Sequence, residues 1–179
     1  TYTFDVRADF DKNIFIVNTP TWLSRAVEVY LIESLPNQQD PVSIFADPPL
    51  LKDDVYQVRA LVSNASRVEL RSASTAYPNW LDRFLQLPSN FPEAIRTLAL
   101  EITQDLDSPY DKAQAVTSYL RENITYSQAL PEIPASVDPI EWFLFTHQEG
   151  FCNYYATAEV LMLRSLGIPA RLAVGYAEG

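Results

Sequence analysis

The stretch Gly150-Phe-Cys-Asn-Tyr-Tyr-Ala-Thr-Ala-Glu159, continued by Val160-Leu-Met-Leu-Arg-Ser-Leu-Gly-Ile-Pro169, decides the fold of this chain. Its apolar residues cover most sides of a helical pattern, so we predict a central, largely buried helix from Cys152 to Leu166. Gly167 can adopt the left-handed conformation that ends a helix, and Pro169 prevents its continuation. A rigid helix with a cysteine in its first turn is therefore expected.

The segments on either side of this helix also carry local signals. Arg171–Tyr176 is predicted to form a strand beside it. Upstream, Pro92 suits the first turn of a helix that reaches about Leu106, and Ser108-Pro109 is a start signal for another that reaches about Asn123. Asp138-Pro139 begins a short helix that is anchored by aromatic residues. A short helix is also expected at 79–87.

Residues 1–71 carry strand signals. Tyr2, Phe4 and Val6 alternate with polar residues, and further apolar or alternating runs cover 14–17, 26–33, 55–62 and 68–70. Pro36–Pro49 contains four prolines and is not expected to be a central strand. We predict a small antiparallel sheet or sandwich here.

The apolar period changes from two to about 3.6 around Ser72–Pro78. We therefore predict an α+β chain, with an antiparallel β-rich module at 1–76 and a helical part at 77–179. The chain opens inside an apparent strand, and we expect it to be a piece of a longer protein.

Composition excludes several functional classes. The chain has 179 residues and a net charge of −10, which argues against nucleic acid as a partner because such binding depends on Lys and Arg. No apolar run approaches the length that spans a membrane. A single cysteine allows neither an internal disulfide nor a cysteine zinc cage, and an Asp105–Val116 calcium loop fails because Tyr110 replaces its required glycine. No cofactor or metal site is predicted.

Cys152 has two interpretations. A lone cysteine is often a buried, inert small hydrophobe. At a helix N-terminus, however, the helix dipole favours the thiolate, and the first peptide N–H groups can serve as oxyanion donors. Phe151, Asn153 and Tyr126 are candidate oxyanion or substrate-facing residues.

Three other residues near the cysteine have more ordinary interpretations. Trp142 is expected to pack in the core. Glu159 lies two helical turns after the cysteine, on the same face, and is expected to be a structural carboxylate with a partner. His147, the single histidine, is predicted to be solvated near the end of the preceding helix.

Several fixed-spacing patterns identify a resemblance. Gly150-Phe-Cys152, Tyr155-Ala156, Leu163–Arg171 and Val174-Gly-Tyr176 together resemble the core of the transglutaminase-like superfamily. Upstream, three segments resemble its bacterial branch of membrane-anchored proteins with an extracytoplasmic domain: Tyr110–Ala113, Tyr119–Arg121 and Asp138–Leu144. The resemblance covers about 77–179, as the helical front half of a papain-like, transglutaminase-like core.

The resemblance implies a Cys-His-Asp mechanism, in which Cys152 attacks a protein or peptide amide, forms a thioester and transfers the acyl group to an amine or water. It also implies a location outside the cytoplasm of a bacterium, with membrane anchorage through other parts of the protein. The family's His and Asp lie downstream of the segment that ends here at Tyr176, and His147 does not match them. We expect this chain to be inactive alone, and the longer protein to carry both residues within a few tens of residues after Gly179.

Two alternatives remain open. A cysteine peptidase would use the same half-site, because transfer and hydrolysis differ only in what attacks the thioester. A non-catalytic domain could instead bind peptides in the groove of an old active site, since a fold does not determine function. Self-association is also expected if the terminal strand leaves an unpaired edge.

Overall fold

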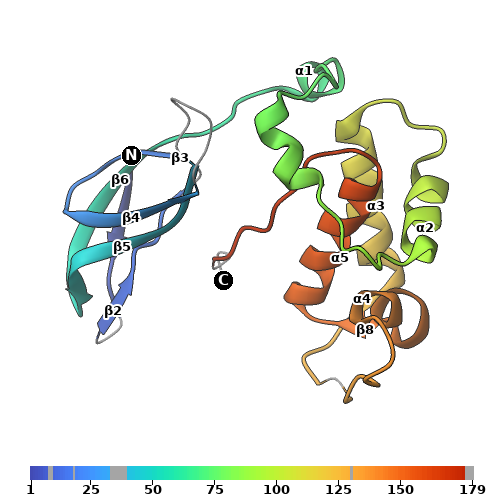
Figure 1. Cartoon of the computed structure of the whole chain (residues 1–179). Coiled ribbons are helices and arrows are strands. Elements are labelled where there is room, and N and C mark those ends of the chain that lie inside the picture. Colours follow the sequence, from blue (N-terminus) through green and yellow to red (C-terminus); the bar gives the residue numbers. More distant parts are fainter. Residues whose placement is uncertain (8–9, 18, 33–39, 130, 176–179) are drawn as a thin grey trace. The chain divides into compact units, whose positions relative to one another are not determined.

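The computed structural model describes residues 1–7, 10–17, 19–32, 40–129 and 131–175. These residues form two compact units, Thr1–Ala65 and Ser66–Val174. The first is built of strands and the second mainly of helices (Figure 1). The predicted α+β class, with antiparallel sheets before helices, is confirmed.

The N-terminal unit contains two three-stranded antiparallel sheets. In each sheet one long strand lies between two others. The orders are β1 (Tyr2–Asp5), β6 (Val55–Leu61), β3 (Thr19–Leu23) and β2 (Phe10–Asn13), β5 (Asp40–Leu51), β4 (Val27–Ile32). Apolar side chains of β5 and β6, together with Ile14 just after β2, form one core of Ile14, Ile44, Ala46, Leu50, Tyr56 and Val58.

The expectation that Pro36–Pro49 contains no central strand is wrong, because β5 is the central strand of its sheet. The prolines lie where pairing is incomplete. Pro41 pairs only with β4, and Pro48 and Pro49 fall between the last partner of β4, Ala46, and the next partner of β2, Leu50. Proline lacks an N–H group, so interruptions of the ladder are where a strand tolerates it.

Two other predicted strands are absent. Ile14–Val17 follows the end of β2 and is not in a strand. The alternating residues 68–70 lie in helix α1 (Arg67–Arg71), because Ser66 forms a capping box with Glu69. The Ser66 N–H donates to Glu69 Oε2 at 2.7 Å, and the Glu69 N–H donates to Ser66 Oγ at 3.3 Å. This local capping outweighs the weak strand signal.

The C-terminal unit packs its helices around one apolar core. Its further elements are η1 (Asn79–Leu85, a 3₁₀ helix), α2 (Glu93–Thr103), α3 (Pro109–Asn123), β7 (Thr125–Tyr126), α4 (Pro139–Glu141), η2 (Trp142–His147, a π-helix), β8 (Glu149–Gly150) and α5 (Cys152–Ser165). The core residues with no exposed surface are Ile95, Ala99, Val116, Phe143, Leu144, Ala158 and Met162. They come from α2, α3, η2 and α5.

The helix starts predicted at Ser108 and Asp138 are confirmed by their caps. Ser108 Oγ accepts a hydrogen bond from the Asp111 N–H at 3.0 Å. The side chain of Asp138 accepts from the Ile140 and Glu141 N–H groups at 2.9 and 3.0 Å. Both caps satisfy donors that have no partner inside their helix.

The end of α5 also matches its prediction, but the following strand does not. Gly167 has a φ of 75°, and the Ile168 N–H returns to the Leu163 carbonyl at 3.0 Å, as in a Schellman motif. Residues 171–175 are not in a strand, and Tyr176 lies outside the described residues. A strand requires a neighbour for its ladder, and Val174 is fully exposed.

A two-residue parallel ladder holds the chain just before α5. The Thr125 N–H donates to the Gln148 carbonyl at 2.9 Å, and the Ser127 N–H donates to the Gly150 carbonyl at 2.8 Å. Gly150 also faces the ring of Phe143, which is fully buried. β7 and β8 therefore fix the point at which the chain enters α5.

We predict that Gly150→Ala destabilises the protein by about 1–3 kcal/mol, because overpacking a rigid core forces atoms apart. The new Cβ would lie 2.6 and 2.8 Å from two carbons of the Phe143 ring. Urea unfolding measures the loss. Gly175→Ala is the control, since its Cβ meets nothing within 4 Å. Equal stability of the two variants would contradict the close contact.

A second prediction concerns Tyr56, which ties two segments of the β unit together. Its hydroxyl accepts from the Phe15 N–H at 2.8 Å and donates to the Phe15 carbonyl at 3.0 Å. Burial raises the pKa of this phenol above its ordinary value of 10.0. As the pH rises above that value the unfolded chain loses the proton first, so stability falls.

Tyr56→Phe should therefore lower the free energy of unfolding by about 1–2 kcal/mol near neutral pH, through the lost hydrogen bonds. The difference in free energy of unfolding between the variant and the wild type should become smaller above about pH 10. In that range the wild type loses the stability contributed by the protonated Tyr56 phenol, which the variant lacks at every pH. Urea titrations at several pH values test this. Tyr30→Phe is a control because Tyr30 is 54% exposed. A difference independent of pH would refute the role of the buried phenol.

Candidate active site

Cys152 is the first residue of α5, and its side chain is exposed. The preceding Phe151 is the extended N-cap residue and gives the helix no side-chain cap. Cys152 Sγ lies 3.7 Å from Asn153 Oδ1. The thiol is therefore open to solvent, and the interpretation of Cys152 as a buried residue is wrong.

The start of α5 also presents backbone donors. Tyr154 and Tyr155 both donate their N–H groups to the Phe151 carbonyl, at 2.9 and 3.3 Å. Within the described part of the chain, no hydrogen bond is recorded for the N–H groups of Cys152 and Asn153. Groups at this position are left without a partner by helix geometry and are suited to binding an anion.

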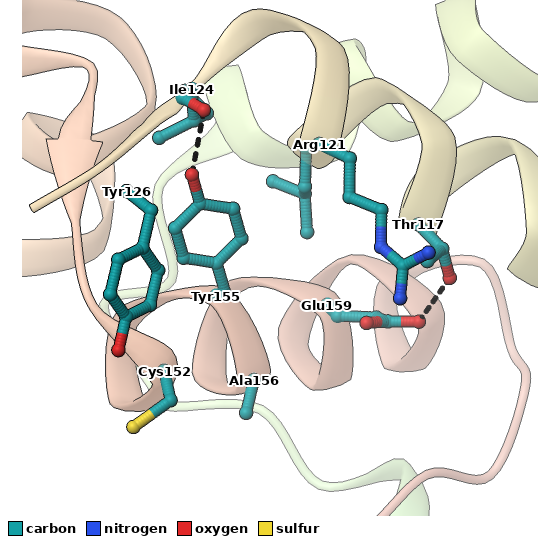
Figure 2. Close-up of a pocket in the computed structure, with 9 residues that line it drawn as sticks. Thr117, Arg121, Ile124, Tyr126, Cys152, Tyr155, Ala156 and Glu159 are labelled. Carbon is teal, nitrogen blue, oxygen red and sulfur yellow. Dashed lines mark hydrogen bonds between the residues drawn. The ribbon is translucent and has the colours of Figure 1, made fainter. Parts of the chain in front are cut away.

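A pocket of about 460 Å³ opens beside the thiol, between α3 and α5 (Figure 2). One wall comes from α3 and the other from α5, and Tyr126 of β7 lies at the end near the cysteine. The lining residues are Thr117, Leu120, Arg121, Ile124, Tyr126, Cys152, Tyr155, Ala156 and Glu159.

The structure brings one of the three predicted neighbours into this pocket. Tyr126 lines it together with Cys152, and its side chain is 59% exposed. Phe151 and Asn153 flank the cysteine in sequence but do not line the pocket. The Phe151 ring packs edge-on against Tyr154, with ring centroids 5.2 Å apart.

Tyr155 belongs to the Tyr155-Ala156 pair of the family-like pattern, but the sequence predicts no individual role for it. Its hydroxyl donates to the Ile124 carbonyl at 2.7 Å, which ties α5 to the end of α3 (Figure 2). Burial, and to a lesser extent the nearby Tyr126, raise the pKa of the Tyr155 phenol. This phenol therefore holds the pocket's two walls together in its neutral form.

Glu159 has a hydrogen-bonding partner, as expected for a structural carboxylate. Thr117 of α3 donates its hydroxyl to Glu159 Oε1 at 2.6 Å. Arg121, one turn further along α3, reaches into the same end of the pocket (Figure 2). The pocket thus has a thiol at one end and charged groups at the other.

The expectation that His147 is solvated is wrong. Its ring stacks on Trp142, with ring centroids 4.3 Å apart and planes inclined by 13°. Its side chain is 24% exposed, and Nε2 is buried and 3.9 Å from Glu149 Oε2, beyond hydrogen-bonding distance. The reason is the π-helix η2, which brings His147, its last residue, over Trp142, its first residue. His147 is not among the residues that line the pocket.

Within the described residues, no group of three or more His, Cys, Asp or Glu side chains is arranged to hold a metal ion. Likewise, none of the helices in the described part of the chain has the length and apolar character needed to cross a membrane.

Residues 96–179 match a family model described as the transglutaminase-like superfamily. YebA of Bacillus subtilis is 43% identical over 115 residues, which cover 63% of this chain and 16% of that protein. A protein-glutamine gamma-glutamyltransferase of Pseudomonas aeruginosa is 28% identical over 152 residues, which cover 84% of this chain and 22% of that protein. The chain therefore spans less than a quarter of either relative.

Solved structures extend the similarity to the fold of both units. The periplasmic domain of TgpA from Pseudomonas aeruginosa, in its ethylmercury-bound form, aligns with a TM-score of 0.61 and 21% identity. The alignment covers 93% of this chain and 54% of that domain. Residues 96–179 thus match the core of the transglutaminase-like superfamily, on a chain that shares the α+β fold of the TgpA periplasmic domain.

Proposed function

We propose that the protein containing this chain uses Cys152 as the nucleophile for acyl transfer or hydrolysis at protein or peptide amides. The observation that carries the proposal is the exposed thiol at the first turn of α5, which opens onto a pocket. A helix that packs on the core through Ala158, Met162 and Leu163 holds a nucleophile rigidly. The family match of residues 96–179 supports the same chemistry.

The proposed reaction has two steps. The Cys152 thiolate attacks the amide carbon, a C–S bond forms, and the C–N bond then breaks as the nitrogen takes a proton and leaves. An amine or water attacks the thioester and releases the thiol. The relative named protein-glutamine gamma-glutamyltransferase supports a glutamine carboxamide as acyl donor, in which case ammonia leaves.

Several groups around the thiol have proposed roles. The free N–H groups of Cys152 and Asn153 would donate to the oxyanion that forms during attack. Tyr126 would face the substrate, because it lines the pocket beside the thiol. Phe151 would act through its backbone, as the extended residue that turns the chain into α5.

The proposed mechanism also needs a general base. His147 stacks on Trp142 and does not line the pocket. We therefore assign the base His and its orienting Asp to parts of the protein outside this sequence, as the family resemblance implies, and expect no turnover by residues 1–179 alone. The peptidase alternative differs only in admitting water rather than an amine to the thioester.

The proposed location is the extracytoplasmic side of a bacterial membrane. The fold similarity to a periplasmic domain supports it. Anchorage would come from other parts of the protein.

The full-length protein tests the function. We expect it to incorporate a fluorescent primary amine into a glutamine-containing protein, and we expect Cys152→Ser to lower this rate by at least about 10⁴-fold, as loss of a nucleophile does. Amide hydrolysis without amine incorporation would favour the peptidase. The nucleophile assignment would fail if Cys152→Ser retained wild-type activity. It would also fail if the wild-type protein bound peptides without turnover and Cys152→Ser bound them equally well.

A further inference from the structure

The end of the pocket that lies away from the thiol holds a guanidinium and a carboxylate. Arg121 comes from α3 and Glu159 from α5, and Figure 2 shows the guanidinium lying over the carboxylate. Glu159 follows Cys152 by seven positions on the same helix, which corresponds to about 10 Å along its axis. The pocket therefore has a reactive end and a polar end a fixed distance apart.

Thr117 orients this carboxylate. Its hydroxyl lies 2.6 Å from Glu159 Oε1 and 2.9 Å from the Ala113 carbonyl, and it has one proton to donate. The shorter distance, and the stronger bond to a charged acceptor, favour donation to Glu159. One carboxylate oxygen is thus held, and its rotamer is set by the neighbouring helix.

The remaining hydrogen-bonding capacity of the pair is open. Within the described ranges of the chain, no ion pair within 4.0 Å joins Arg121 to Glu159, and no further hydrogen bond is recorded for the guanidinium or for Glu159 Oε2. Arg121 is exposed and Glu159 is half-buried. The pair offers several donors next to one acceptor, with no net charge.

The middle of the pocket contributes little polarity. Leu120 and Ile124 present apolar side chains that are almost fully buried. The Tyr155 hydroxyl is already engaged by the Ile124 carbonyl. A ligand that lies along the pocket would therefore find polar partners mainly at its two ends.

We infer that Arg121 and Glu159 bind a backbone peptide group of an extended polypeptide acyl donor, about three residues from the residue that Cys152 attacks. The peptide carbonyl would accept from Arg121, and its N–H would donate to Glu159. This inference rests on the function proposed above. Extended chain rises about 3.3 Å per residue, so about 10 Å corresponds to three residues.

The charge balance of the pair selects this ligand over charged ones. A ligand carboxylate at this position would be attracted by Arg121 but repelled by Glu159, and a ligand ammonium would be attracted by Glu159 but repelled by Arg121. In both cases the repulsion cancels part of the attraction. A peptide group is neutral and has one donor beside one acceptor. The inference predicts a preference for polypeptides over small amides.

Chloroacetamide probes test this on residues 1–179, without need of turnover. The Cys152 thiolate displaces chloride, so that one C–S bond forms, one C–Cl bond breaks and chloride leaves. One probe is a blocked single residue, 2,3-diaminopropionic acid chloroacetylated on its side chain. The other carries the same residue at the centre of an alanine heptapeptide. Intact mass reports the labelling rate.

We expect the heptapeptide to label Cys152 at least about fivefold faster than the single residue, a ratio typical of one net hydrogen bond. Arg121→Met and Glu159→Gln should each remove this advantage, and Thr117→Val should reduce it. The matched controls Arg67→Met and Glu122→Gln change exposed residues that do not line the pocket and should leave the ratio unchanged. Equal iodoacetamide rates in all variants verify an intact thiol site.

The outcomes separate the two proposals. If iodoacetamide labels Cys152 only after unfolding, the nucleophile proposal fails. If iodoacetamide labels the native thiol but both probes react equally, or if the two pocket variants keep the heptapeptide's advantage, the peptide-binding role of Arg121 and Glu159 is overturned and the nucleophile proposal stands. The wild-type comparison decides this even where a variant is unstable.

Discussion

The contact between the Phe143 ring and the bare Cα of Gly150 is the constraint on which the site depends. It leaves no room for a side chain, so Gly150 of β8 packs directly against the buried ring of Phe143 in η2. The two backbone hydrogen bonds between the β7 and β8 segments then fix the point at which the chain enters α5. Because Phe151 alone separates this ladder from the helix, the position of Cys152 follows from the packing of the core.

Features that depend on neighbouring residues were predictable from the sequence. Ser108 and Asp138 cap helices through groups two or three positions away, and Gly167 ends α5 through its own φ angle. The prolines of β5 were misjudged because their tolerance depends on where the partner strands β2 and β4 stop. The stacking of the partly exposed His147 on Trp142 depends on a π-helix, which has no clear sequence signal.

The candidate site divides in the same way. Cys152 could be singled out from its place at the start of an apolar helix, and a partner for Glu159 could be expected from the cost of an unpaired carboxylate. That this partner is Thr117 could not be predicted from the sequence, and neither could the hydrogen bond from Tyr155 to Ile124. Both cross from α5 to α3, and the rotation of two packed helices about their axes is set by the whole core.

The single residue between β8 and α5 leaves this segment no slack in length. Each position along a helix turns a side chain by about 100°, so one residue added at Phe151 would carry the thiol out of the stripe it shares with Tyr155 and Glu159, or displace the whole stripe from α3. Substitution here alters contacts, whereas insertion or deletion alters angular phase. The short connection therefore fixes the angular position of α5, and we expect the loop at 131–138 to tolerate changes in chain length that this junction cannot.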